Sequence, residues 1–349
     1  WSGNALPIPK IQISVPNYTP IFKSGLISLK GNYSHGWFGD YSEHAKGYFL
    51  HQKSLYVRIG KPEWHFRMHV GANHQAQWGG KPAVPYEQKG TGRLITSYGN
   101  NFRAYRAIVL GEPIHPDEDP DIFGDGTLNE AGNRAGNHLG TFDVALEFDH
   151  AKTNILLYRQ SIYEDGSLFY LSNIHDGLTG ISFGFKEVEQ GIQKIVVEYL
   201  HTTDQGGPTS SAHTTPELRG RDNYFNNGVY RDGWSYHGNT IGSPFMIPYT
   251  QITGFEYKGR TDRLIANNRV KALSVGLKSR AGIFDLLTRL SYSKNWGSYR
   301  DPLNAAQTSI QQTVSFPIRT FAVQAGLFYD QGDLLEKNLG LQLAVKRSF

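Results

Sequence analysis

The sequence predicts an all-β protein, a large transmembrane antiparallel β-barrel, and three observations favour that fold. Long stretches alternate between apolar and polar residues, which is typical of strands because successive side chains point to opposite faces. The stretches run for roughly 9–12 residues, enough to cross a bilayer at a tilt, whereas the strands of soluble sandwiches average about 5–6. Aromatic residues gather at their ends, and very long connections alternate with short ones, as in membrane barrels.

The segment NLGLQLAVKRSF shows the alternation most clearly. One face carries Leu339, Leu341, Leu343, Val345 and Phe349, with Arg347 as the exception, and the other face carries small or polar residues. We expect this strand to close the sheet, with its last aromatic ring at the membrane interface, as is common in outer-membrane barrels.

The same pattern predicts about fourteen strands in this chain. They cover 8–16, 25–38, 53–61, 66–78, 141–150, 154–164, 177–186, 192–202, 249–258, 269–278, 284–295, 308–318, 320–330 and 338–349. A helical period of 3.6 residues is visible in the segment 100–111. Short links at 317–319 and 332–337 contrast with long loops at about 79–140 and 203–248.

Each predicted strand has one apolar and one polar or small face, which sets its orientation in a barrel. We expect lipid contact for Phe142, Val144, Leu146, Leu273, Val275, Leu277, Leu341 and Leu343, and lumen contact for Asp143, Glu147, Gln342 and Lys346. The aromatic residues expected at the two membrane interfaces are Tyr33, Trp37, Tyr292, Trp296, Tyr299, Phe328, Tyr329 and Phe349. The chain is therefore interpreted as a single barrel domain over residues 1–349.

Composition limits the alternatives. The chain has no cysteine, which excludes disulfide bonds and thiolate metal ligands. No stretch approaches the about 18 consecutive apolar residues of a transmembrane helix. The formal net charge of +4 at pH 7 suits either ordinary solubility or attraction to an acidic polymer.

Catalytic motifs are weak. GISFG at 180–184 fits the G-x-S-x-G pattern, but that nucleophile turn needs a strand followed by a helix, and here the residues lie inside an alternating strand. The histidines are scattered, and we expect them to be polar residues of the lumen or loops: His35, His69, His74, His201, His213 and His237. The sequence thus favours a protein that is not an enzyme and needs no cofactor. A hydrolase barrel, in which a serine and a histidine meet in space, is the alternative.

An acidic segment, DEDPDIFGDG at 117–126, resembles a calcium loop in composition. It lacks the glycine at position 6 and the glutamate at position 12 of an EF-hand. A divalent cation could still relieve the repulsion among Asp117, Asp119, Asp121 and Asp125. A solvated acidic loop without metal is the alternative.

The loop at 203–248 holds the best binding signal, the segment RGRDNYFNNGVYRDGWSYHGN. Flat aromatic faces cover the C–H faces of sugar rings, while amides, carboxylates and guanidinium groups bond their hydroxyls and uronic carboxylates. The candidate polysaccharide ligands are Arg221, Asp222, Asn223, Tyr224, Tyr230, Arg231, Trp234, Tyr236 and His237. The alternative is a plug, in which the loop folds into the lumen and its aromatic residues pack a private core.

Several segments resemble the capsule-assembly Wzi family of outer-membrane barrels. They include WSGNALPIPKIQISVPNYTPI, HQKSLYVRIGKPEW, GNHLGTFDVALEF, YLHTTDQGGPT and, most specifically, GRDNYFNNGVYRDGWSYHGNTIGSPF. The resemblance implies a surface-exposed protein of the bacterial outer membrane that holds capsular polysaccharide, lectin-like and without catalysis. It also implies further residues before WSGNALPIP, so that a complete barrel has roughly 16–18 strands.

The partners expected from this interpretation are a capsular or other acidic surface polysaccharide and outer-membrane lipid or lipopolysaccharide. Other outer-membrane proteins are further candidates, and nucleic acid is not expected. Two rival functions stay open. One is a channel or transporter for small solutes, and the other is a structural subunit of a larger outer-membrane complex.

Overall fold

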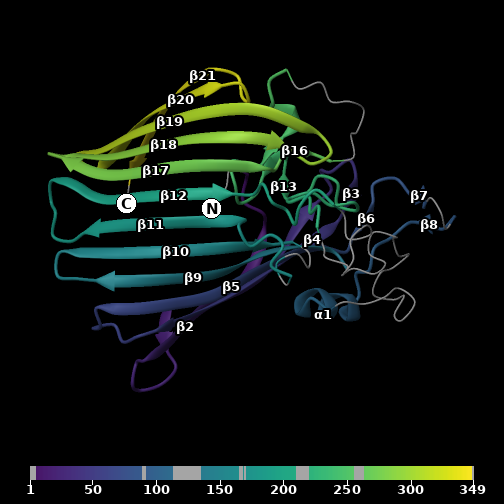
Figure 1. Ribbon diagram of the computed structural model, residues 1–349, viewed down its shortest axis with the longest axis horizontal. Coiled ribbons are helices and arrows are strands. Elements are labelled where there is room, and N and C mark those ends of the chain that lie inside the picture. Colours follow the sequence, from purple (N-terminus) through teal and green to yellow (C-terminus); the bar gives the residue numbers. More distant parts are fainter. Residues whose placement is uncertain are drawn as a thin grey trace.

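One antiparallel sheet dominates the computed structural model, which describes residues 5–88, 92–112, 135–164, 168, 170–209, 220–254 and 263–347. Thirteen strands follow each other in chain order across it (Figure 1). They are β1 (Lys10–Pro20), β2 (Ile27–Gly39), β4 (Tyr48–Ile59), β5 (Phe66–Trp78), β9 (Asn137–Asp149), β10 (Thr153–Tyr163), β11 (Gly177–Phe185), β12 (Gly191–His201), β17 (Val270–Ala281), β18 (Phe284–Gly297), β19 (Pro302–Ile318), β20 (Phe321–Gly332) and β21 (Asn338–Arg347). The predicted all-β class and the antiparallel arrangement are confirmed.

One predicted strand is wrong. Residues 249–254 do not join the sheet, because Tyr249–Gln251 form a short 3-10 helix, η2, after Pro248. The other end of that prediction, 255–258, lies outside the described residues. The motif at 180–184 does lie in a strand, β11, which leads through a turn into β12 rather than into a helix.

The two faces of the sheet differ in chemistry, as the alternation predicts. In β9, Phe142 and Val144 are exposed on the outer face while Asp143 is buried on the inner face. The register carries this parity across the sheet, for example from Val197 of β12 to Val275 of β17. Leu341 and Leu343 share the outer face with the apolar residues of β20. Gln342, Lys346 and Glu147 lie on the other face, so the predicted division of these side chains between two faces is confirmed. Their contact with lipid or with the lumen stays a prediction.

Polar pairs cover the inner face. Arg67 donates two hydrogen bonds to Glu147, at 2.9 and 2.8 Å, and His69 lies 2.9 Å from the same carboxylate. Tyr56 donates to Asp143 at 2.6 Å. A cavity of about 870 Å³ runs along this wall and is lined by residues from β1 to β12, so the sheet curls around a polar interior. Phe328, expected at a membrane interface, instead lines a second inner cavity.

The connections separate the sheet into two ends. At one end the strands are joined by turns as short as 282–283 and 319–320. The long loops 79–136 and 202–269 both lie at the other end, which we call the loop end (Figure 1). The link 333–337 is short, as predicted, but it also lies at the loop end.

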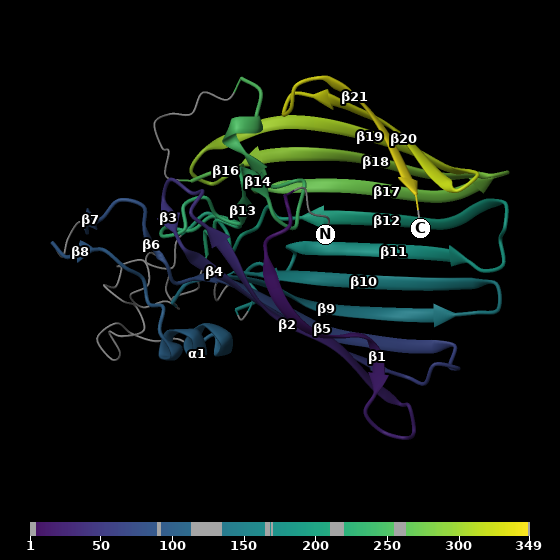
Figure 2. The same cartoon turned by 180° about the vertical axis from the view of Figure 1, so that it is seen from behind.

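The two edges of the sheet are β1 and β21. Both strands are exposed along almost their whole length, and within the described residues they are not paired with each other. Figure 2 shows the curled sheet from behind, with β1 and β21 at its margins. The additional strands expected to pair with these edges stay a prediction.

The described parts of the connections at the loop end contain short strand pairs and one α-helix. The pairs are β3 (Ala45–Lys46) with β6 (Lys81–Pro82), β7 (Tyr86–Glu87) with β8 (Leu94–Ile95), β13 (Ser235–Tyr236) with β14 (Asn239–Thr240), and β15 (Ile247–Pro248) with β16 (Ile265–Asn267). The helix predicted at 100–111 is confirmed as α1 (Phe102–Leu110). Asn101 caps its first turn by accepting from the Ala104 N–H at 2.8 Å, and Gly111 ends it in a left-handed conformation. Neither helix in the described part of the chain combines the length and the hydropathy that a membrane span requires.

Candidate functional site

The loop between β12 and β17 packs into the inner face of the sheet at the loop end. Tyr224, Tyr230 and Trp234 are each at most 2% exposed and share a hydrophobic core with inward-facing residues at the strand ends, among them Leu50 and Leu139. We call residues 220–249 the plug. The plug core is continuous with the inner wall, so the loop packs inside the curled sheet at this end.

Hydrogen bonds and a glycine fix the plug in place. Gln77 of β5 donates to the Gly233 carbonyl at 2.9 Å, and the Tyr230 hydroxyl donates to the Gly79 carbonyl at 3.0 Å. Gly233 has a φ of +59°, and a Cβ there would lie 2.0 Å from the Phe225 carbonyl oxygen. A side chain at this position would therefore break the turn that presents Trp234 to the core.

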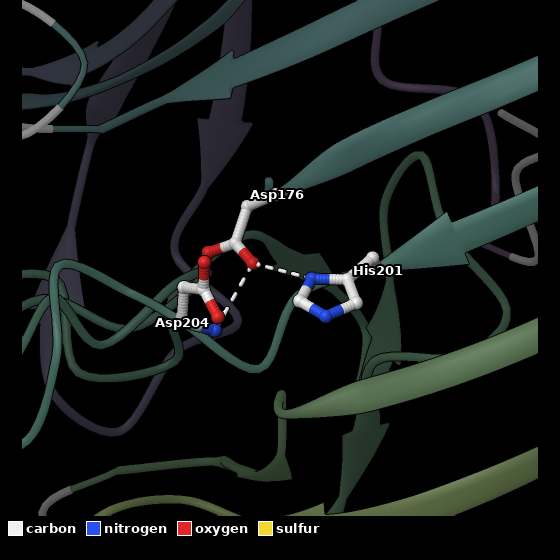
Figure 3. Close-up of side chains that lie close together, drawn as sticks. All are labelled: Asp176, His201 and Asp204. Carbon is white, nitrogen blue, oxygen red and sulfur yellow. Dashed lines mark hydrogen bonds and ion pairs between the residues drawn. The ribbon is translucent and has the colours of Figure 1, made fainter. Parts of the chain in front are cut away.

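A buried carboxylate, Asp176, anchors the start of the long loop (Figure 3). Its Oδ1 accepts from His201 Nδ1 and from the Asp204 N–H, both at 3.0 Å. Its Oδ2 accepts from the Gln205 N–H at 2.7 Å and from the Tyr224 hydroxyl at 2.9 Å. Burial raises the pKa of Asp176, an effect that these donors partly offset, and burial also raises the pKa of Tyr224 well above its usual range.

The group Asp176, His201 and Asp204 also has the spacing of a metal site, because one ligand atom of each lies within 4.8 Å of the others. The hydrogen bonds decide between the two interpretations. Each oxygen of Asp176 already accepts two of them, which uses the capacity of a carboxylate, and a metal ion would have to displace those donors. The arrangement therefore fits a structural anchor.

The structure divides the predicted sugar ligands into two sets. Asp222, Tyr224, Tyr230, Trp234 and Tyr236 are buried, Asn223 is half-buried, and Arg221, Arg231 and His237 are exposed. The aromatic faces of the buried set are covered by protein in this conformation. Asn223 also has a structural task, since its Oδ1 accepts from Asn226 and from Asn268. The candidate calcium residues Asp117, Asp119, Asp121 and Asp125 lie outside the described part of the chain.

His237 lies at the tip of the β13–β14 hairpin. His237 and Gly238 both have positive φ values, as a two-residue hairpin turn requires. The Tyr41 ring stacks on the imidazole, with centroids 4.4 Å apart and planes at 24°. Its hydroxyl donates to the Ser235 carbonyl at 3.1 Å, and burial raises the pKa of Tyr41 to about 12. The stack gives the plug an outward aromatic surface.

His44 and Asp232 extend this surface, with His44 Nε2 and Asp232 Oδ1 3.9 Å apart. We call Tyr41, His44, Asp232 and His237 the hairpin patch. Sequence reasoning missed Tyr41 and His44, which come from the link 40–47 between β2 and β4. Their only signal was an aromatic and a histidine in a short polar link, and nothing local connects that link with the plug.

A second group, half-buried except for His175, surrounds Arg269, just before β17. The Arg269 guanidinium lies 3.9 Å from the centroid of the Tyr299 ring, and its Nε donates to the Thr203 carbonyl at 3.3 Å. The Tyr299 hydroxyl donates to the Asp204 carbonyl at 2.8 Å. His175 Nδ1 lies 2.9 Å from Asp204 Oδ2. We call Arg269, Tyr299, Asp204 and His175 the arginine patch.

The sequence did not predict the arginine patch as a binding site. Arg269 and Tyr299 lie far apart in the chain, and Tyr299 was assigned to the membrane interface. Both are half-buried, so the guanidinium and the ring edge remain within reach of a ligand. An arginine held against a ring is a pre-oriented donor for a carboxylate.

These features define a class: a curled antiparallel sheet of the outer-membrane barrel type, with a plugged loop end and polar, aromatic patches beside the plug. Residues 1–246 match the family model described as capsule assembly protein Wzi, more than half of the chain. The chain therefore belongs to the capsule assembly protein Wzi family. No curated protein sequence matches it significantly.

Several solved structures resemble the fold. The Escherichia coli outer-membrane protein Wzi, described as a carbohydrate-binding β-barrel involved in group 1 capsule assembly, has a TM-score of 0.48 and 15% identity over 91% of this chain and 55% of its own. BamA from Haemophilus ducreyi lacking POTRA domains 1–3 has a TM-score of 0.41 and 10% identity, over 97% of this chain and 62% of its own. The iron transporter FrpB of Neisseria meningitidis has a TM-score of 0.36 and 7% identity, over 89% of this chain and 43% of its own. The chain thus spans 55% of the length of the Wzi structure.

Proposed function

We propose that this protein is a non-enzymatic β-barrel of the bacterial outer membrane that binds a capsular or other acidic polysaccharide at the cell surface. Membership of the capsule assembly family supports the class of ligand. The observation that carries the proposal is the half-buried stack of Arg269 on Tyr299, beside the plug. The carbohydrate binding described for the Escherichia coli Wzi structure is consistent with it.

The two patches suit an acidic polymer. In the arginine patch, Arg269 can bond the carboxylate of a uronic acid with its geometry already set by Tyr299 and Thr203. In the hairpin patch, Tyr41 and His237 offer a ring surface and polar groups for a neutral sugar unit. Arg221 and Arg231 of the plug stay candidates for further weak subsites, because they are exposed. Several weak subsites would retain a polymer while it remains mobile.

Removing either partner of the arginine stack should weaken polysaccharide binding. We expect Arg269→Ala to reduce affinity by about tenfold to a hundredfold, since charge-assisted hydrogen bonds contribute about 1.5–3 kcal/mol. Tyr299→Ala should reduce it less, by the about 0.5–1 kcal/mol of an exposed cation–π contact. Binding of an acidic polysaccharide by the detergent-solubilised protein would be measured at low and high salt. The Arg269→Ala loss should shrink at high salt, because salt screens exposed charges.

Lys23→Ala is the matched control, since Lys23 is an exposed cation in the turn between β1 and β2, at the end opposite the plug. It should bind as the unmodified protein does. Equal losses of affinity for Lys23→Ala and Arg269→Ala would show that binding depends only on the net charge of the protein. The arginine patch would then no longer be part of the proposal. Unchanged binding by both Arg269→Ala and Tyr299→Ala would overturn it directly.

The outer-membrane location gives a separate prediction. Leu273 is half-exposed on the outer face of β17, and its neighbour Ser274 faces the inner cavity. Leu273→Arg should impair assembly, because an arginine on the lipid-facing surface is costly, with a maximum of about 2–4 kcal/mol at the midplane. Ser274→Arg should be tolerated much better. Heat-modifiable barrel in isolated outer membranes would be quantified for both, and equal yields would contradict this orientation.

A further inference from the structure

Helix α1 lies on the outer face of the sheet, not in its interior. Ala104, Ala107 and Ile108 of the helix pack against Ala76 and Trp78, which point outward from β5. Figures 1 and 2 both show α1 beside the sheet at the loop end, apart from the plug. The part of the long loop that contains α1 therefore covers a part of the outer surface.

Polar contacts hold the helix there. The Lys53 ammonium of β4 donates to the Val109 carbonyl in the last turn of α1, where a cation is favourable. The hydroxyls of Tyr105 and Tyr33 lie 2.6 Å apart. These two hydrogen bonds lie on the outer side of the sheet, and they fix the position of α1 on it.

The surface beneath α1 is the polar end of an otherwise apolar band. Outward-facing residues nearer the short turns are apolar: Leu55, Val57, Ile59, Phe66, Met68, Val70, Phe142, Val144, Leu146 and Phe148. Nearer the loop end, the outward-facing residues become polar. Lys53 of β4 pairs with His74 of β5. In the next outward-facing row, Ala76 of β5 pairs with His51 of β4 on one side and with His138 of β9 on the other. His35 pairs with His51 on the same face. The expectation that His35 and His74 lie in the lumen or loops is therefore wrong.

This row marks where the apolar band ends. His74 Nε2 donates to His138 Nδ1 at 2.7 Å, and His138 Nε2 donates to the Ala135 carbonyl at 2.7 Å. His51 is fully buried under the loop. Polar groups at this height are excluded from lipid by α1, so the helix itself lies at the level where hydrocarbon gives way to head groups.

The far side of α1 combines apolar and basic residues. Phe102 is 80% exposed and Leu110 is 62% exposed, although both are large apolar side chains. Arg103 and Arg106 are exposed on the same side, opposite Ala104 and the other packed residues, as the 3.6-residue period requires. Arg106 also lies 3.5 Å from Glu112, but an exposed pair of this kind is weak and leaves the arginine available.

We propose that α1 is an interfacial helix that fixes the loop end to the outer leaflet, with Phe102 and Leu110 inserted at the head-group boundary and Arg103 and Arg106 bound to the phosphates of anionic lipid. The inference rests on the outer-membrane location in the proposed function. Two observations select lipid as the occupant. The helix continues the apolar band of the sheet, and its exposed face carries the pairing of apolar and basic residues that interfacial helices use.

Residues 1–349 contain no cysteine, so a single label can be introduced at a chosen position. Leu110→Cys would be labelled with an environment-sensitive fluorophore, and the protein would be reconstituted in vesicles of phosphatidylcholine, with or without phosphatidylglycerol. Lipids carrying a nitroxide near the head group should quench this label several-fold more than lipids carrying it deep in the chain. Val84→Cys, an exposed loop position, should be quenched by neither. Leu273→Cys, in the apolar band of β17, should be quenched by the deep nitroxide.

The arginine contribution is tested in the same system. Arg103→Ala combined with Arg106→Ala should reduce head-group quenching at Leu110→Cys in the phosphatidylglycerol vesicles at low salt, and much less in phosphatidylcholine alone. If Leu110→Cys behaves like Val84→Cys while Leu273→Cys is quenched, the inference about α1 is overturned and the membrane location stands. If Leu273→Cys is not quenched, the location itself fails. A Leu110→Cys label shielded from aqueous iodide but unquenched by either nitroxide would indicate a protein cover and overturn the lipid assignment.

Discussion

Trp234→Ala is expected to destabilise the plug by about 3–5 kcal/mol, the usual cost of removing a buried tryptophan or phenylalanine side chain. Trp234 is 2% exposed, and it borders a cavity of about 200 Å³ together with Leu50, Leu139 and Ile162. Its indole N–H has no partner among the described residues, so the loss comes from packing rather than from a hydrogen bond. Removing the indole would enlarge this cavity between the plug and the inner wall.

Two measurements would detect the loosened plug. The thermal unfolding midpoint should fall, and single-channel conductance should rise from near silence, because the plug packs inside the curled sheet at the loop end. Trp234→Phe should recover most of the stability. Arg231→Ala, at an exposed position three residues before Trp234 in the same loop, should change stability by less than about 0.5 kcal/mol. A conductance that is already high in the unmodified protein would favour a small-solute channel instead.

The sheet was largely predictable because its signal is local. Alternation along a single strand is enough to locate β9 or β21, and a one-residue slip would move every apolar side chain to the wrong face. The failed strand at 249–258 alternates as well, but Pro248 and Gly254 flank a segment that forms η2 instead. Composition alone does not separate a strand of the sheet from a loop segment that packs on it.

The site was less predictable because exposure in a loop is set by distant partners. Trp234 and His237 lie three residues apart, yet one is in the core and the other at the surface. The choice depends on Gln77, near the end of β5, and on Gly79, just after β5, which hold the turn before Trp234. The buried aromatic residues of the loop pack as the plug alternative expects. The binding proposal therefore depends on rings that solvent can reach, those of Tyr41, His237 and Tyr299.

The same reasoning applies to the outer surface. The helical period in 100–111 is visible in the sequence, but its docking side is not. Histidines normally indicate a polar environment, so His51 and His74 gave no hint of an outer face. The parity of β4 and β5 places them there, and α1 supplies the cover that makes this placement tolerable.

Asp176→Ala should be as damaging as Trp234→Ala, for an electrostatic reason. The carboxylate is 0% exposed and accepts from His201, the Tyr224 hydroxyl and the N–H groups of Asp204 and Gln205. Alanine would leave all four donors without this acceptor, and the Gln205 N–H and the Tyr224 hydroxyl are fully buried. Removing one partner of a buried charged network costs about 3–5 kcal/mol. The residues after β12 and the Tyr224 side chain would lose their common anchor, so we expect proteolysis to begin near 203–209.

Asp176→Asn separates charge from shape. Its Oδ1 can still accept from two of the donors, and the new amide can donate to His201 if the imidazole adopts its other tautomer, with Nε2–H donating to the Thr203 hydroxyl 3.1 Å away. The asparagine variant should therefore lose less stability than the alanine variant. Asp204→Ala is the matched control, because that side chain is partly exposed and its ion pair with the exposed His175 is worth at most about 1 kcal/mol. Equal unfolding temperatures for Asp176→Ala and Asp204→Ala would show that Asp176 does not anchor the loop. Added Zn²⁺ should leave the unfolding temperature of the unmodified protein unchanged, whereas a rise that disappears in Asp176→Asn would reinstate the group as a metal site.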